Sequence, residues 1–368
     1  MGTITKRGEL QWQARVRRNG FPPQVRTFMY REDAEKWVRG LEREMETTGF
    51  VDRKEAEANT LAKILQRYKQ EVTPRKKSAE IEAVKIDVIL RDAALVSLKM
   101  TAITSKAVAA WRDRRLAVVS GATVNREIDV ISTVLNHARR EWGIYVDNPI
   151  PYVKRPEKAK ARDRRFSPDE ERYLLSYLES GERRTDGTFT KGTRNPWLAP
   201  LLRLALETAM RRGELLALRW ELVDLDKQTA HLPDTKNGDA RTVPLSTRAV
   251  AILKSLPYEL EDEHSSEDDP RVGPVFGTTA MALRKGFTRA VERAREQYLA
   301  DCKTQKKRPV PGFLEDVHFH DSRHEAASRL ADKLSNMLEL SAVTGHKDLR
   351  MLKRYYHPRA EDLAKKLG

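Results

Sequence analysis

The amino-acid sequence predicts a mainly helical, multidomain protein with small β elements. The prediction depends on apolar residues that recur at helical spacing through much of the chain. It also depends on short alternating segments near the amino terminus and a turn signal between residues 235 and 245. The 368 residues are enough for two or three domains. Because 39% of them are hydrophobic, with six Trp and ten Tyr, the chain can form packed cores.

Residues 1–55 are expected to form a small β-sheet with one helix. Apolar and polar residues alternate from 12 to 16, which predicts a strand with one buried face. An Asn-Gly turn separates it from a second expected strand at 24–30. Apolar residues at helical spacing then predict a helix over 31–49, which a glycine ends.

Residues 59–150 are expected to form a domain of about four helices. A threonine precedes three of the helical stretches, where its hydroxyl can accept a hydrogen bond from the first turn. These threonines are Thr60, Thr104 and Thr123. A further helix is expected at about 78–90.

A basic segment at 151–165 is expected to link this domain to the next. From 154 to 165 the chain holds seven Lys or Arg residues and two acidic ones, with a proline and little apolar surface. Ser167 and Glu170 then form a capping box with proline at the first helical position, so the last domain, 166–368, starts its first helix there.

Caps and turn residues predict the further elements of the last domain. These are helices at 195–207 and 212–220, a β-hairpin at 235–245, a helix begun by Ser246, and surface loops at 259–269 and 303–308. A helix that contains Tyr355 is expected to end at His357 and Pro358.

The charge of the chain points to a polyanionic partner. The formal net charge is +15 and the isoelectric point is near 9.7. We expect no membrane association, because the sequence has neither a signal peptide nor an apolar run of about 18–20 residues. Cys302 is the sole cysteine, so an internal disulfide is excluded and a cytoplasmic location is expected.

Three groups of basic residues are candidates for contact with the phosphates of double-stranded DNA. Residues 1–31 alone hold seven Lys or Arg residues and one Glu. The alternatives are a structural appendage at the amino terminus, and solvated faces for the helical and linker groups. The candidates are Arg15, Arg17, Arg18, Arg112, Arg114, Arg115, Lys158, Lys160, Arg162 and Arg164.

The most specific pattern lies in the last fifty residues. His320 and Arg323 form an HxxR pair, His346 follows a glycine, and Tyr355 comes nine residues after His346. Two imidazoles, a guanidinium and a phenol, without a carboxylate cluster for a metal, suit nucleophilic attack by tyrosine on a phosphodiester. Upstream, the string RRGELL carries Arg211 and Glu214, and DTKNGDARTVPL carries a lysine beside the turn of the hairpin.

These residues, in this order, resemble the tyrosine recombinase (phage integrase) family. The matched positions are Arg211, Lys236, His320, Arg323, His346 and Tyr355. The strings LALETAMRRGELLALRW and VHFHDSRHEAASRL look especially like those of bacterial prophage integrases and shufflon-type DNA invertases. The chain departs from the pattern at Ala209, where Gly is frequent, and at Ser322, where Leu is frequent; we expect only local packing changes there.

The resemblance implies both a domain organisation and an activity. It implies an arm-type DNA-binding module at 1–55, a core-binding DNA-binding domain at 59–150, and a mixed α/β, mostly α, catalytic domain at 166–368. It further implies site-specific DNA recombination through a 3′-phosphotyrosyl bond, for integration and excision of a mobile element, with no cofactor and no metal. The implied partners are double-stranded DNA, three further copies of the chain in a tetramer on paired sites, and accessory DNA-bending proteins.

The resemblance also implies a role for each matched side chain. Arg211 and Arg323 would hold the phosphate, and His346 would donate a hydrogen bond to it. Lys236 would protonate the leaving oxygen. His320 would accept or hold the proton of Tyr355. Glu214 is not a matched position; its place three residues after Arg211, on the same helix face, predicts that it orients neighbouring groups.

Several alternatives stay open at this point. Tyr356 competes with Tyr355 as nucleophile, and the offset from His346 favours Tyr355. His318, His320 and His324 invite a metal site, but their spacing lacks a paired acid and a distant fourth ligand. A shufflon-type invertase, a type IB topoisomerase-like relaxing enzyme and a non-catalytic DNA-binding protein are the competing functions.

Overall fold

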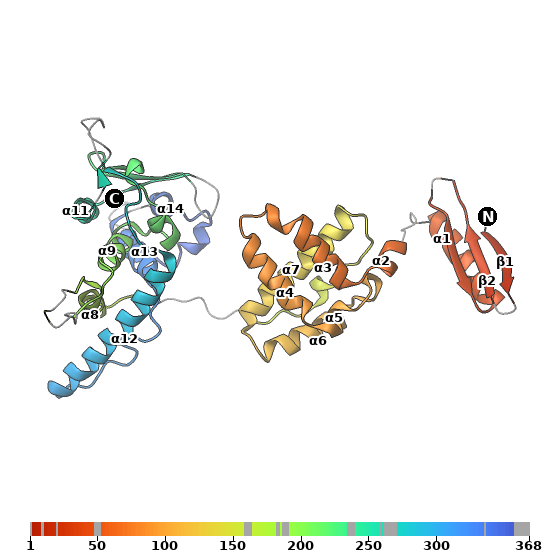
Figure 1. Ribbon diagram of the computed structural model, residues 1–368, viewed down its shortest axis with the longest axis horizontal. Coiled ribbons are helices and arrows are strands. Elements are labelled where there is room, and N and C mark those ends of the chain that lie inside the picture. The colour runs from red at the N-terminus through yellow and green to blue at the C-terminus, as the bar shows by residue number, and fades with distance from the viewer. Residues whose placement is uncertain are drawn as a thin grey trace, which may run out of the picture. The chain divides into compact units, whose positions relative to one another are not determined.

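The chain folds into two compact units, Met1–Ala161 and Arg162–Gly368 (Figure 1). The computed structural model describes residues 2–8, 11–19, 21–47, 53–157, 164–181, 185, 191–233, 240–257, 259–260, 271–334 and 336–356. Helices dominate both units and the sheets are small, so the expected fold class is confirmed. Within these ranges, no helix has the length and apolar character needed to cross a membrane.

The first unit begins with an antiparallel sheet of strand order β1-β2-β3, packed on one helix. The elements are β1 (Gly2–Gly8), β2 (Gln11–Val16), β3 (Gln24–Phe28) and α1 (Arg31–Thr47). The alternation in β2 places Ala14 and Val16 in the core with Ala34 and Val38 of α1. The strand β1 was not predicted, because only Ile4 marks its apolar face.

The rest of the first unit is a helical domain with a core of its own. Its helices are α2 (Lys54–Ala58), α3 (Leu61–Glu71), α4 (Ala79–Leu90), α5 (Ala93–Val96), α6 (Ser105–Leu116) and α7 (Gly121–Arg140). Three short 3-10 helices join them: η1 (Thr73–Arg75), η2 (Met100–Ala102) and η3 (Ile150–Tyr152). Tyr68 and Trp111 are among its largest buried side chains.

The expected caps of this domain are confirmed for two helices and wrong for the third. The hydroxyl of Thr60 accepts from the backbone of Lys63, and that of Thr104 accepts from Ala107. Thr123 does not begin α7, because Ser120 accepts from its backbone N–H and starts the helix earlier.

The second unit is helical around one small sheet. Its helices are α8 (Pro168–Leu178), α9 (Leu198–Thr208), α10 (Arg212–Leu216), α11 (Thr247–Lys254), α12 (Ala280–Thr304), α13 (Asp321–Lys333) and α14 (Met337–Thr344). Its strands are β4 (Val223–Asp224), β5 (Thr229–Leu232), β6 (Arg241–Pro244), β7 (Glu259–Leu260) and β8 (Arg271–Val272). Two 3-10 helices, η4 (Trp220–Leu222) and η5 (Leu349–Met351), complete it.

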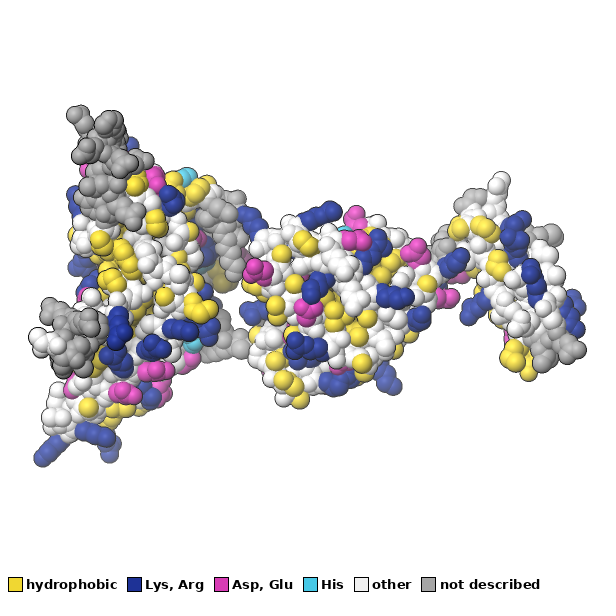
Figure 2. All heavy atoms as spheres, in the orientation of Figure 1, with side chains coloured by type: hydrophobic (Ala, Val, Ile, Leu, Met, Phe, Trp, Pro, Cys, Tyr) yellow, Lys and Arg dark blue, Asp and Glu magenta, His cyan; other side chains and the backbone are white. Residues whose placement is uncertain are grey.

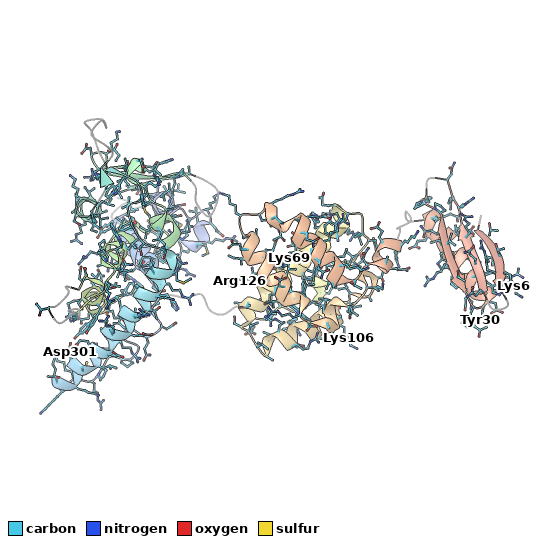
Figure 3. The ribbon with its side chains drawn as sticks, in the orientation of Figure 1. Lys6, Tyr30, Lys69, Lys106, Arg126 and Asp301 are labelled. Carbon is cyan, nitrogen blue, oxygen red and sulfur yellow. The ribbon has the colours of Figure 1, made fainter. Side chains whose placement is uncertain are left out.

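The core of this unit surrounds α9, whose residues are mostly buried. The predicted capping box of Ser167 and Glu170 begins α8, and Ser246 caps α11 as expected. The long helix α12 packs along α8. Asp301, labelled in Figure 3, lies near the end of α12 and accepts a hydrogen bond from the hydroxyl of Tyr173 at 2.6 Å.

Three expectations for this unit are wrong. The helix expected to reach Trp220 ends at Leu216, because residues 218–220 exchange backbone hydrogen bonds with 273–275. The surface loop expected at 303–308 starts too early, because the helix α12, which was not predicted, runs to Thr304; residues 305–308 lie outside the helix and are exposed as expected. Tyr355 lies in a hydrogen-bonded turn after η5 rather than in a regular helix.

Candidate active site

The connection between α9 and α10 brings Arg211 into the site. Ala209 takes a left-handed conformation (φ 52°) and ends α9. Arg211 then has extended backbone at the N-cap of α10. Its N–H donates to Oε2 of Glu214 at 2.7 Å, and its guanidinium donates to Oε1 at 2.8 Å. Glu214 therefore fixes both the backbone and the side chain of Arg211.

The same carboxylate binds Arg241, which lies at the start of β6. The two terminal nitrogens of Arg241 donate to the two oxygens of Glu214 at 2.9 and 2.8 Å. Burial alone would raise the pKa of Glu214, but the hydrogen bonds from Arg241 and Arg211 outweigh it and lower the pKa to about 2. The ionised Glu214 thus ties the β5–β6 hairpin to Arg211.

Arg323 lies in the interior, where α13 meets the ends of α9 and α14. Its side chain donates to the carbonyl oxygen of Ala209 and, at 2.6 Å, to that of Thr344. Burial and the nearby charge of Arg211 lower the pKa of Arg323 to about 9. The guanidinium is therefore still cationic at neutral pH.

His346 follows Gly345, whose left-handed backbone (φ 68°) ends α14. Its Nδ1 lies 2.7 Å from the hydroxyl of Thr344, and its Nε2 lies 3.4 Å from Arg323. Since the Thr344 hydroxyl donates its own proton to Leu340, it accepts from Nδ1. Burial and the charges of Arg323 and Arg211 lower the pKa of His346 to about 4, so the ring is neutral at pH 7 with Nε2 unprotonated.

Tyr355 lies against α13 and near His346. Its hydroxyl is hydrogen-bonded to Nδ1 of His324. Its ring centroid is 6.4 Å from that of His346. The ring of His320 meets that of His324 edge-on at 5.3 Å. His320 keeps an exposed side, yet the burial of its ring, with His324 and Arg323 nearby, lowers its pKa.

The described contacts thus bring five of the six predicted catalytic residues together. Arg211, Arg323, His346 and Tyr355 form one cluster, and His320 joins it through His324. Lys236 lies outside the described residues, between β5 and β6. These two strands pair as an antiparallel hairpin, but the first of them, Thr229–Leu232, precedes the expected bounds of 235–245.

Sequence analysis considered His324 only as a metal ligand and assigned no role to Arg241. For His324 a signal was present, because it comes four residues after His320 and therefore shares a helix face with it. For Arg241 there was none, because its pairing with Glu214 depends on how the hairpin packs against α10.

The candidate DNA-binding arginines of the helical domain all have partners within the protein. Arg114 donates twice to Asp92, and Arg115 donates twice to the buried carboxylate of Glu127. Arg112 donates to the adjacent Asp113 and to the carbonyl oxygen of residue 154. These contacts stabilise the domain, and contact of the three arginines with DNA stays a prediction.

In the amino-terminal module, Arg15 lies on the open face of the sheet. It pairs across the strands with Thr3 and Val25, which alternate with the residues that face the core. Val25 is 49% exposed. Arg17 is exposed just beyond β2, whereas Arg18 forms an ion pair with α1. Figure 2 shows Lys and Arg side chains on the visible face of this module.

The expected linker is partly folded at both ends. Arg155 forms an ion pair with Asp129 of the helical domain. Arg164 donates to Glu170, the capping residue of α8. Arg165 donates to Glu325 of α13. The other three candidate cations, Lys158, Lys160 and Arg162, lie outside the described residues.

The surface of the second unit carries a basic hollow at the start of α12. Its volume is about 830 Å³, and Arg212, Arg284, Lys285 and Arg289 contribute its positive charges. Across the parts of the chain that the structure describes, no three His, Cys, Asp or Glu residues are grouped as metal ligands.

A phenol held by an imidazole, beside the buried guanidinium of Arg323 and the half-buried guanidinium of Arg211, is a site for covalent attack by tyrosine on a phosphate ester. The sequence matches the Phage integrase family over residues 164–362. The chain therefore belongs to the phage integrase family of tyrosine recombinases, as its motifs predicted. It is a tyrosine-type site-specific recombinase.

Two relatives illustrate this membership. The chain is 37% identical to the shufflon-specific DNA recombinase of Escherichia coli over 84% of its own length and 71% of that protein. A relative from Haemophilus influenzae is 32% identical over 99% of this chain and 88% of its own length, so this similarity extends through the amino-terminal module.

Solved structures of integrases share the fold. The Tn1549 transposon integrase in complex with circular intermediate DNA has a TM-score of 0.60 at 16% identity, covering 84% of this chain and 99% of that one. A lambda integrase tetramer bound to a Holliday junction has a TM-score of 0.54 at 19% identity, covering 94% and 95%. At this identity the similarity is one of architecture.

Proposed function

We propose that the protein cleaves and rejoins double-stranded DNA at specific sites through a 3′-phosphotyrosyl intermediate, and that it integrates and excises a mobile element. One observation carries the proposal: the Tyr355 hydroxyl lies beside the cluster of Arg211, Arg323 and His346. A phenol in this position can attack phosphorus while fixed donors stabilise the charge that develops on the phosphate oxygens.

In the proposed cleavage step, the Tyr355 oxygen bonds to phosphorus and the bond from phosphorus to the 5′ oxygen breaks. The guanidiniums of Arg211 and Arg323 bind the non-bridging oxygens. Lys236 gives the departing 5′ oxygen its proton. Because the phosphotyrosyl bond keeps the energy of the phosphodiester, a second DNA end can attack it without ATP.

The role of His346 in this proposal depends on its protonation when DNA binds. In the free protein its Nδ1 donates to Thr344, so its unprotonated Nε2 cannot donate to a phosphate. A bound phosphodiester places negative charge beside the ring, which raises the pKa of His346 and favours the imidazolium. We therefore expect His346 to take up a proton as DNA binds and to donate from Nε2 afterwards.

We propose double-stranded DNA as the partner and a homotetramer on two recombination sites as the active assembly, with DNA-bending proteins as accessories. The net charge of +15 supports a nucleic-acid partner. The open sheet face with Arg15 and the basic hollow on α12 are the surfaces best suited to contact phosphates.

The test uses DNA from both flanks of the gene, prepared as nicked duplexes that trap the covalent complex. The wild type and Tyr356→Phe should form a protein–DNA adduct on a denaturing gel. Tyr355→Phe should bind the same DNA and form none. An adduct whose DNA-linked peptide carries Tyr356, or no adduct with any flanking DNA, would overturn the proposal.

DNA inversion is the second candidate, and the 37% identical shufflon-specific recombinase favours it. The two activities differ in the sites that they join. Integration joins sites on two separate DNA molecules, whereas inversion joins two inverted sites on one molecule. A plasmid pair and a single plasmid with inverted sites, incubated with the same protein, distinguish them by the size of the products.

A further inference from the structure

His324 contacts the nucleophile of the proposed reaction. Helix α13 places it one turn after His320, so the two rings lie on one helix face. Its Nδ1 is hydrogen-bonded to the Tyr355 hydroxyl, and the side chain is half-buried. We propose that His324 is the catalytic residue that accepts the proton of Tyr355 during cleavage and returns it during rejoining.

The contact itself allows either direction, because a phenol can donate or accept and Nδ1 can do either according to the tautomer of the ring; the proposal assigns the phenol as the donor. A phenol O–H donates, and an imidazole nitrogen without a proton accepts. In the proposed arrangement Nδ1 of His324 is the unprotonated nitrogen, and the proton of the neutral ring is on Nε2. This arrangement has the geometry of a general base in contact with its substrate proton before the reaction begins.

The proposed step balances with the groups present. As the Tyr355 oxygen bonds to phosphorus, its proton moves to Nδ1 of His324. The phosphorus–oxygen bond to the 5′ side breaks, and the 5′ oxygen takes a proton from Lys236. Rejoining reverses both transfers: the 5′ hydroxyl returns its proton to Lys236, and the departing phenolate takes one from His324.

The other two histidines of the site have different contacts. The Nδ1 of His346 donates to Thr344, and its Nε2 faces the guanidinium of Arg323. His320 meets the ring of His324 edge-on, so it is placed to orient His324. The expectation that His320 acts directly on the tyrosine proton therefore shifts, in this proposal, to His324.

This inference rests on the proposed function, so one of its two measurements needs no DNA. An arylsulfonyl fluoride labels a tyrosine faster when a neighbouring base takes its proton. In the free full-length protein, His324→Ala should slow labelling of Tyr355 by about tenfold or more, measured by peptide mass spectrometry. His318→Ala, at an exposed histidine of the same motif, is the matched control and should label as wild type. Equal rates in wild type and His324→Ala would overturn the proposal whether or not the protein cleaves DNA.

The second measurement is the single-turnover rate of adduct formation on the nicked duplex. His324→Asn keeps an acceptor near the position of Nδ1 but cannot take the proton. Both His324→Asn and His324→Ala should lose roughly 100- to 10,000-fold in rate, the range of a general base. Their DNA affinity should stay within about threefold of wild type, because His324 acts on Tyr355 rather than on DNA.

Imidazole added to the buffer should restore part of the rate of His324→Ala and none of the rate of Tyr355→Phe. Wild-type speed in His324→Asn would mean that His324 only orients the phenol, and the proton-transfer proposal would be wrong. If no protein forms an adduct while the labelling difference persists, the proposed function fails and the contact between His324 and Tyr355 stands.

Discussion

Replacing Glu214 by Gln removes the negative charge that holds Arg211 and Arg241 together. The carboxylate is 6% exposed and accepts four hydrogen bonds from these two arginines. Its pKa falls from 4.5 to about 2 on folding, which corresponds to about 3 kcal/mol of stability at neutral pH. Breaking a buried ion pair from one side typically costs about 3–5 kcal/mol, a similar amount.

The expected result is a lower melting temperature of the catalytic domain. For a domain of this size, 1 kcal/mol corresponds to roughly 2–4 °C, so Glu214→Gln should lower the melting temperature by roughly 6–12 °C at pH 7. Calorimetry of the full-length protein measures this shift. The control is Glu292→Gln, at an exposed glutamate of α12, which should change the melting temperature by less than about 2 °C.

The pH dependence gives the same prediction an independent check. Because folding lowers the pKa of Glu214, its contribution is fully present above pH 4.5 and is lost as the pH falls towards 2. The difference in melting temperature between wild type and Glu214→Gln should therefore be constant from neutral pH to about pH 5 and should become smaller below that. A gap under 2 °C at pH 7, or one that is as wide at pH 3, would refute the reasoning.

Four further predictions follow from the site and the linker. Ala209→Gly should raise the free energy of unfolding by about 1 kcal/mol in urea, because Ala209 is left-handed (φ 52°); a lower midpoint would contradict this. Replacing the three cations of 158–162 by Ala should make the slope of log K for DNA binding against log salt concentration shallower by up to about 3 units, without loss of site preference. An unchanged slope would mean that these cations do not contact phosphates. Adduct formation should persist in excess EDTA, because the proposed charge-stabilising groups are arginines; cleavage restored only by magnesium would argue against this. Lys236→Ala should cripple cleavage of normal DNA but spare a substrate with a 5′-bridging sulfur, and equal defects would exclude Lys236 as the acid.

The parts of the fold that sequence analysis predicted correctly depend on local interactions. Thr60, Thr104, Ser167 and Ser246 each accept a hydrogen bond from a backbone N–H within the next turn, so the signal and the structure lie in the same few residues. The end of α10 was predicted four residues too late, because the bridge of Arg219 to residue 274 is made with a segment far away in the sequence.

In the candidate site, too, features that are local in the sequence could be predicted, whereas contacts between distant residues could not. The order of its motifs along the chain identified the family and predicted six catalytic residues. The order could not show that His324 rather than His320 contacts Tyr355, because that contact joins residues 31 positions apart across the packing of α13 and the turn after η5. Nor could it show that Arg241 shares the carboxylate of Glu214, 27 positions away.

Two left-handed residues explain how Arg211 and Arg323 are held in the free protein. Ala209 ends α9 and Gly345 ends α14, and each helix C-terminus directs carbonyl oxygens at the site. The carbonyl of Ala209 accepts from Arg323, and that of Gly345 accepts from Arg211. Helix C-termini carry partial negative charge, so these oxygens offset the repulsion between the buried guanidinium of Arg323 and the half-buried guanidinium of Arg211. The left-handed conformations at Ala209 and Gly345 therefore contribute to the electrostatics of the site. They end each helix with a carbonyl group directed at an arginine.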